Sequence, residues 1–237
     1  MTKFLPILLA IGYALLIYSF SAWRTKRELD QRSTPLADPV LKRITDRMAE
    51  ALGVDRVPVH IYEIEPVNGL AAPDGRIFLT RGFYNRYRAG EVTAEELASV
   101  IAHELGHVAL GHTRRRMIDF SGQNAVFASL VALVLRAVPV VGPLIAVWVA
   151  RLVTAALAAR LSRSDEYEAD EWASALLIKA GIGTAPQKSL FRKLSALTGM
   201  REGAVPAWLL SHPPPERRIA AIEANEARWM QARLPRA

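Results

Sequence analysis

Cysteine is absent from the 237 residues, so disulfide bonds and thiolate metal ligands are excluded. Any metal site in this chain must therefore be built from histidine and carboxylate side chains. Internal repeats and low-complexity tracts are also absent, which excludes repeat architectures. With 51% hydrophobic residues the chain can bury one full-sized core and carry an extra segment or two, and a second domain is not required.

Acidic residues are in deficit, at 23 against 30 basic residues, which gives a net charge of +7. An excess of this size could indicate a nucleic-acid partner, but the basic residues cluster at 24–32 and 114–116, beside apolar stretches. Basic clusters in these places are typical of membrane orientation signals. We therefore expect a lipid bilayer as a partner and no nucleic acid.

The N-terminal segment reads as a membrane anchor. Residues 4–20 are apolar apart from Tyr and Ser, and Trp23 and several basic residues follow. Because a basic cluster directly after an apolar run disfavours export, we predict an uncleaved anchor over residues 1–23, with a cleaved signal peptide as the alternative. The rest of the chain would lie on the cytoplasmic side of the inner (plasma) membrane, or alternatively in the periplasm. Residues 24–37 read as a polar linker.

The stretch 101–107 carries an HExxH motif inside a helical pattern of apolar residues. Positions four apart lie on one face of a helix, so His103 and His107 can offer two imidazole nitrogens to one zinc ion. Glu104 can act as the general base that activates a water molecule for peptide-bond hydrolysis. A capping box at 93–96 and Gly111 predict where this helix begins and ends.

Two histidines leave a third protein ligand to be found, and the acidic cluster 165–171 is the best source. Glu166 and Asp170 are four apart and share a helix face with small alanines. One of the two carboxylates could bind zinc while the other orients a ligand histidine, with Asp165, Glu168 and Glu171 pointing into solvent. The alternative is an acidic first turn of a helix over 164–180 that only complements the helix dipole. His112 would point from the wrong face of its helix.

The segments before the motif predict a helix over 38–53 and a small sheet of two or three strands from 57–64, 70–72 and 76–80. Residues 68–73 could form an edge strand that binds a peptide as one more strand, or an ordinary hairpin. After the motif, residues 121–160 read as two apolar helical arms. These arms form either a membrane-inserted hairpin or a hairpin packed on the soluble domain. Further helices are expected at 186–198 and from within 211–218 toward 228.

Three motifs occur in a fixed order: HELGH at 103–107, RSDEYEAD at 163–170, and HPPPERRI at 212–219, with the apolar segment between the first two. This combination resembles the membrane metalloendopeptidase family of HtpX and the CAAX prenyl proteases, most closely the HtpX branch, over residues 38–225. The resemblance implies an α+β, mainly helical fold. It would comprise a gluzincin-type metalloprotease domain over 38–237 with a small β-sheet, an N-terminal transmembrane helix and the apolar hairpin.

The resemblance also implies roles for single residues. His103, His107 and Glu166 would hold one Zn²⁺ per chain, Glu104 would be the general base, and Asp170 would accept the second N–H of a ligand histidine. His212 and Arg218 would lie close to the cleft, where they could stabilise the oxyanion. The family's edge strand Asn-Ala-Phe-Ala corresponds here to Asn68, Gly69, Leu70 and Ala71, which would contact the substrate.

Together these features predict a membrane-anchored zinc endopeptidase that cleaves unfolded or membrane-associated proteins in protein quality control. A different class remains open: a zinc-binding chaperone or assembly factor that holds extended polypeptides with little or no proteolysis. Because the residues of the HExxH motif are all present, with Glu104 as the expected base, we favour the enzyme.

Overall fold

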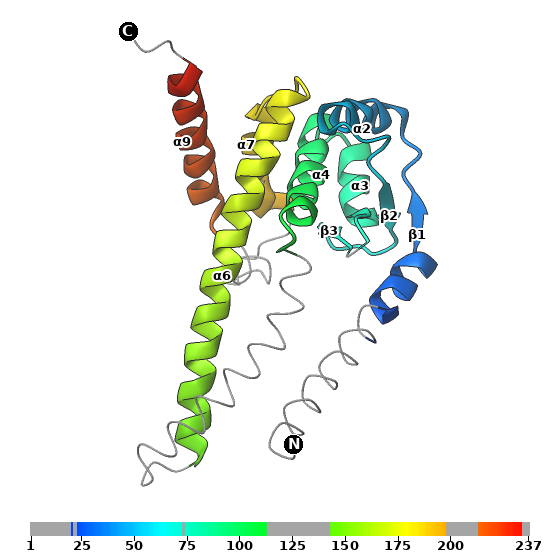
Figure 1. The fold of residues 1–237 in the computed structure, drawn as a ribbon. Helices are drawn as coiled ribbons and strands as arrows, with labels where there is room; N and C mark the ends of the chain where they lie inside the picture. The colour runs from blue at the N-terminus through cyan, green and yellow to red at the C-terminus, as the bar shows by residue number, and fades with distance from the viewer. Residues whose placement is uncertain (1–19, 21–22, 73, 113–142, 198–212, 234–237) are drawn as a thin grey trace, which may run out of the picture. The chain divides into compact units, whose positions relative to one another are not determined.

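A computed structural model describes residues 20, 23–72, 74–112, 143–197 and 213–233 of the chain (Figure 1). The chain divides into two compact units, one of residues 1–31 and 112–162 and the other of residues 32–111 and 163–237. The second unit contains the residues that the sequence marks as functional, and it is described by itself below.

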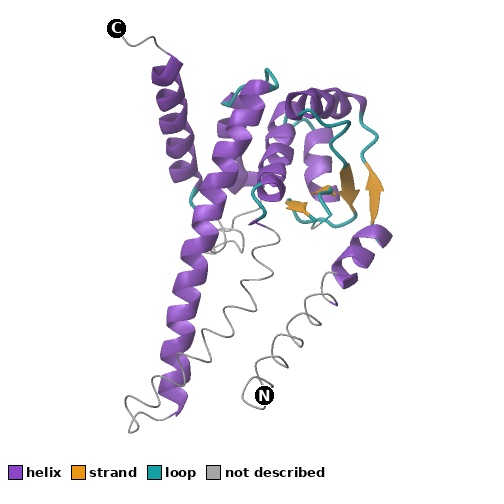
Figure 2. Cartoon of the chain, viewed as in Figure 1, coloured by secondary structure: helices purple, strands orange, loops and turns teal. Residues whose placement is uncertain are grey.

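The second unit begins with a four-stranded sheet and three helices (Figure 2). Its elements up to the HExxH helix are β1 (Ser33–Pro35), α2 (Pro39–Leu52), β2 (Val59–Tyr62), β3 (Gly69–Ala71), β4 (Ile77–Thr80), α3 (Arg81–Arg88) and α4 (Ala94–Ala109). The strand order is β1-β2-β4-β3; β2 and β4 are parallel and the two outer pairs are antiparallel. The remaining helices are α6 (Pro143–Lys179), of which the part from Arg163 belongs to this unit, α7 (Ala185–Leu197) and α9 (Pro215–Arg233).

Helix α2 has the ends that the sequence predicts. The Asp38 side chain accepts hydrogen bonds from the backbone N–H groups of Val40 and Leu41 and so caps the first turn. Gly53 ends the helix in the left-handed conformation, at φ 71°, where glycine has no steric cost. The apolar stripe of the helix, including Leu41 and Met48, is fully buried in the core.

Helix α4 crosses the middle of this unit and its beginning is also as predicted. Thr93 and Glu96 form the capping box: the Thr93 side chain accepts from the Glu96 backbone, and the Glu96 side chain accepts from the Thr93 backbone. Leu97 and Ile101 are completely buried in a core that joins α2, the sheet and α6. Helix α4 therefore contacts α2, the sheet, α6 and α7 (Figure 1).

Three local expectations were wrong or incomplete. Residues 33–35, expected within a polar linker, form β1 and pair with β2, so the sheet has four strands. Helix α3 was not predicted, although Thr80 caps it by accepting a hydrogen bond from the Phe83 backbone N–H. Helix α6 runs unbroken from Pro143, so the acidic cluster lies in its middle and does not form the first turn of a helix. The cluster therefore cannot serve as an N-terminal complement to the helix dipole.

The membrane predictions concern residues that lie mostly outside the described ranges. The anchor predicted over residues 1–23 lies outside the described residues except for Phe20 and Trp23, and the part of the apolar hairpin up to residue 142 lies outside them as well. Residues 143–160 of that hairpin form the beginning of α6. Within the described ranges, no helix has both the length and the apolar composition that a bilayer span requires.

Candidate metal centre

Helices α4 and α6 come unusually close at Gly106. A Cβ atom at this position would lie 2.9 Å from the backbone oxygen of Ala169 and 3.2 Å from its Cα. Only glycine therefore lets α4 rest on the α6 backbone, and Ala169 and Ala173 on the facing side are fully buried. This contact brings the HExxH motif next to the carboxylates of the acidic cluster.

The side chains of His103, His107 and Glu166 converge at this contact. Their ligand atoms all lie within 4.8 Å of one another, and all three residues are buried. The two Nε2 atoms are 3.1 Å apart, His103 Nε2 is 3.2 Å from one Glu166 oxygen, and His107 Nε2 is 3.4 Å from the other. Among the described residues this is the group of histidines and carboxylates that could hold a metal ion.

The shape of this triangle fits a tetrahedral ion. Four ligands at the usual zinc distances of about 2.0–2.1 Å are separated by about 3.3–3.4 Å in tetrahedral geometry. The separation of the two Nε2 atoms and the distance from each Nε2 to one of the two Glu166 oxygens lie close to that value. Two imidazoles and one carboxylate also favour zinc or a similar transition metal over calcium or magnesium, which take oxygen ligands. The residues present therefore fit the ion that the sequence motif predicts.

Asp170 fixes the orientation of His103. The Nδ1 atom of His103 lies 2.9 Å from an Asp170 carboxylate oxygen, so Nδ1 donates its proton there and Nε2 is left to bind an ion. Burial opposes a charged imidazole, but the hydrogen bonds to Asp170 and Glu166 outweigh it and raise the pKa of His103 to about 9. The site thus attracts positive charge, and a metal ion would displace a proton from it.

Arg218, at the start of α9, holds Asp170 in turn. Burial would raise the pKa of Asp170, but the Arg218 charge and hydrogen bonds hold the pKa of this carboxyl below its usual range. Both oxygens of Asp170 accept hydrogen bonds from the Arg218 guanidinium, at 2.6 and 2.7 Å. Three helices far apart in the sequence, α4, α6 and α9, therefore meet in one buried network.

Glu104 lies on the side of α4 that faces strand β3. A Cβ atom at Gly69 would be 2.6 Å from a Val100 methyl group and 3.4 Å from Oε1 of Glu104, so the strand approaches the helix closely here. Strand β3 pairs with β4 alone among the described strands, which makes it an edge strand and also one arm of a hairpin. Asn68, just before it, donates its backbone N–H to the Thr80 hydroxyl, and its backbone carbonyl accepts from the hydroxyl and the backbone N–H of Thr80. Gly69 of the predicted substrate strand thus lies beside Glu104, and Asn68 lines the same pocket.

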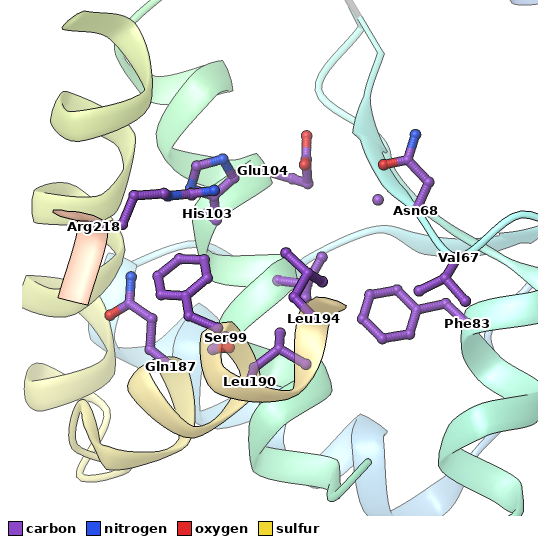
Figure 3. Close-up of a pocket in the computed structure, with 13 residues that line it drawn as sticks. Val67, Asn68, Phe83, Ser99, His103, Glu104, Gln187, Leu190, Leu194 and Arg218 are labelled. Atoms are coloured by element: carbon purple, nitrogen blue, oxygen red, sulfur yellow. The ribbon is translucent and has the colours of Figure 1, made fainter. Parts of the chain in front are cut away.

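A pocket opens between this edge strand and α7, next to His103 and Glu104 (Figure 3). Its walls are largely apolar, with polar groups near the metal ligands. The apolar lining consists of Val67, Phe83, Val100, Leu190, Phe191 and Leu194. Figure 3 shows Glu104 between His103 and Asn68, while Arg218 and Gln187 lie on the opposite side of the view from Val67 and Phe83. The lining residues of α3 and α7 were not identified from the sequence.

Three other residues were considered from the sequence: His112, Asp165 and His212. His112 is buried but does not belong to the group that could hold an ion. Asp165 is buried, which corrects the expectation that it points into solvent, because it shares a face with buried Ala169 one turn later. His212 lies outside the described residues.

Comparisons with known proteins agree with the geometry. The family model of "Peptidase family M48" matches residues 35–226. Metalloprotease LoiP of Escherichia coli (strain K12) is 31% identical over 202 residues, 83% of this chain and 75% of that protein. Metalloprotease YcaL of the same organism is 30% identical over 180 residues, 74% of this chain and 66% of that protein. A protease HtpX homolog of Bordetella pertussis is 26% identical over 230 residues, 82% and 71% of the two chains.

Proposed function

The chain belongs to peptidase family M48 and is a metalloendopeptidase, and from this premise we propose a zinc-dependent hydrolase of unfolded or membrane-associated polypeptides. One observation carries the proposal: the buried triangle of His103, His107 and Glu166 lies beside Glu104, at an apolar pocket next to β3, the edge strand of the sheet that the described residues form. The triangle supplies ligands, Glu104 supplies a base, and the edge supplies a place for a peptide.

The roles of the residues follow from their positions. When bound, zinc supplies Lewis acidity, which makes water a stronger nucleophile and polarises the scissile carbonyl group. Glu104 accepts the proton of the attacking water and passes it to the leaving amine. Asp170 keeps the Nε2 atom of His103 directed at the ion, because it accepts the proton on Nδ1.

The substrate would bind as an additional strand along β3. Backbone groups at a sheet edge can pair with an extended chain, and Gly69 of this edge strand lies beside the Glu104 side chain. The apolar pocket next to them would receive one substrate side chain, with Val100 and Leu194 in its walls. A binding mode of this kind requires an extended segment, which an unfolded protein offers and a folded one does not.

The deciding experiment compares casein digestion by the wild type and by Glu104→Gln, with zinc content measured in both. The wild type is expected to digest casein, and the variant to lose about 10²- to 10⁴-fold in rate at unchanged zinc content, because only the base is removed. Glu95→Gln, on the exposed face of the same helix, is the matched control and should behave as the wild type. Equal cleavage by wild type and Glu104→Gln, or cleavage by neither, would overturn the catalytic assignment.

The same pair of proteins tests the second candidate function. The edge strand and the pocket could hold an extended polypeptide without cutting it, which is what a chaperone or assembly factor does. If the wild type suppresses aggregation of an unfolded protein without cleaving it, and Glu104→Gln does so equally, the holding function replaces the hydrolase. Loss of an intact substrate band by the wild type alone supports the hydrolase.

We further propose that residues 1–23 anchor the enzyme in the inner membrane with the active site on the cytoplasmic side. Residues 4–20 are apolar, and the aromatic rings of Phe20 and Trp23 are 60% and 54% exposed beside basic residues. The Arg27 guanidinium lies over the Trp23 ring, at 5.4 Å from its centroid. Aromatic and basic residues together are typical of the membrane–water interface. A reporter that is active only in the cytoplasm, fused after Ala237, is expected to be active; an inactive fusion favours the periplasm.

A further inference from the structure

Arg218 is almost fully buried at the metal centre, although its side chain carries a permanent charge. It is 4% exposed, and its Nε and Nη2 atoms donate to the two oxygens of Asp170 at 2.6 and 2.7 Å. The flat face of the guanidinium is covered by Phe191, whose ring centroid lies 4.2 Å from Cζ. A guanidinium engaged in this way is held in one orientation, since the two-pronged pair and the ring contact both fix its plane.

The position of Arg218 relative to His103 decides what it can do. Nη2 lies 3.2 Å from Nδ1 of His103, which is the nitrogen directed at Asp170. The nitrogen directed at His107 and Glu166 is Nε2, at the other end of the imidazole ring. Arg218 therefore lies on the Nδ1 side of the ligand histidine, and its Nη2 atom is farther, at 3.8 Å, from the nearest Glu166 oxygen; an oxyanion would form on the Nε2 side.

We propose that Arg218 is a positioning residue that acts through Asp170 and His103, and that it does not bind the oxyanion. This inference rests on the proposed hydrolase function. Arg218 neutralises the buried carboxylate of Asp170 and fixes its plane. One oxygen of Asp170 is then held 2.9 Å from Nδ1 of His103, where it accepts the proton on Nδ1. Without the guanidinium, the Asp170 carboxylate would lose the two contacts that fix its plane, and His103 would lose its orientation.

The two roles predict different results in a double-mutant cycle. If Arg218 acts only through Asp170, its removal should have little further effect once Asp170→Asn has already broken the link, so the effects are strongly non-additive. If Arg218 binds the oxyanion, its removal should lower kcat by a similar factor in both backgrounds, because the oxyanion contact does not depend on Asp170.

The experiment uses the full-length protein as wild type, Arg218→Met, Asp170→Asn and the double variant. Three quantities are measured: the rate of zinc release to a chelator, the visible absorption spectrum of the cobalt-substituted protein, and kcat and KM for a fluorogenic peptide. Each single variant is expected to speed zinc release by about tenfold or more and to alter the cobalt spectrum, and the double variant to match Asp170→Asn. KM should change little, because Arg218 would not hold the substrate.

Two further variants keep the test decisive. Arg217→Met removes an exposed charge one residue earlier and should leave zinc release unchanged. Arg218→Lys keeps the charge but loses the two-pronged contact; it should fold even if Arg218→Met does not, and its zinc release should be intermediate.

Wild-type zinc release and cobalt spectra in Arg218→Met and Arg218→Lys, with kcat falling equally in both Asp170 backgrounds, would overturn the proposal in favour of oxyanion binding. The Glu104→Gln experiment is independent of this result. A failure of the hydrolase assignment would appear there, with zinc release still reporting on the role of Arg218.

Discussion

The two sides of helix α4 are held in different ways. On the side of α6 and α9, charged groups are buried and bonded to one another; Glu166, Asp170 and Arg218 are all less than 5% exposed. On the side of β3 and α7, the pocket is lined by apolar groups, and several of them, including Val67 and Leu194, remain half-buried. One helix therefore carries both a closed ionic network and an open apolar surface.

Because of this difference, the two sides of α4 should respond differently to amino-acid substitutions. Removing one member of a buried ionic network leaves another charge unpaired, which costs several kcal/mol and disturbs every partner. Removing a methyl group from a pocket wall changes affinity by about 1–3 kcal/mol and leaves the rest in place. We therefore expect substitutions on the α6 side to cause large losses of catalytic activity, and substitutions on the β3 side to change substrate specificity in small steps.

The largest effect is expected from Glu166→Gln, which removes a charged ligand from the buried triangle. Zinc content should fall far below one ion per chain, and peptidase activity should fall by about 10³-fold or more, because the ion is then held by two neutral imidazoles. Metal analysis after gel filtration and the casein assay measure the two losses. Glu168→Gln, exposed on the same helix, is the control and should keep both zinc and activity. Full zinc occupancy in Glu166→Gln would exclude Glu166 as a ligand.

An intermediate effect is expected at Glu96, which joins the start of α4 to α7. Its carboxylate accepts from Ser189 Oγ at 2.6 Å and from Lys193 Nζ at 2.8 Å. Burial opposes its ionisation, but the contacts with Lys193 and Ser189 lower the pKa of Glu96 from 4.5. Its stabilising contribution should thus be complete above about pH 4.5 and be lost as the pH falls through the lower folded-state value.

Glu96→Gln should accordingly reduce the free energy of unfolding by about 2 kcal/mol at pH 7 and by progressively less below pH 4.5. Urea unfolding at several pH values measures this difference, with Glu95→Gln on the exposed face as control. The Glu96 carboxylate bonds to Thr93, Ser189 and Lys193, none of which lines the pocket, and Ser99 of the lining bonds only to the Glu96 backbone carbonyl, so kcat of the folded variant should hardly change. A stability loss that is the same at pH 7 and pH 3.5 would contradict the assignment of an ionised Glu96.

The smallest effect is expected at the contact of Gly69 with Val100 in the pocket wall. Gly69→Ala would place a methyl group 2.6 Å from a Val100 methyl, so Val100 must move and kcat/KM should fall by about tenfold. Val100→Ala makes room, and the double variant should recover most of the loss. Val100→Ala alone should favour peptides with larger apolar side chains. A peptide series with varied apolar residues measures these shifts; no recovery in the double variant would mean that the strand does not press on the helix there.

The sequence by itself determined the local features of this protein. Residues close in the sequence decide where a helix begins and which side chains share a face, so the caps of α2 and α4 and the pairing of His103 with His107 followed from spacing alone. The family, its metal chemistry and the candidate ligand Glu166 came from three motifs in order, because motifs of that specificity leave few alternatives.

Only the tertiary structure decided what lies opposite each of those faces. Helical spacing shows that Glu166 and Asp170 share a face, but it cannot show that α6 is unbroken from Pro143 or that Gly106 lets the two helices touch. Nor can it show that Arg218, 48 residues beyond Asp170, closes the network on the Nδ1 side of His103. Contacts over such separations arise from packing of the whole core, in which each helix position depends on all its neighbours at once.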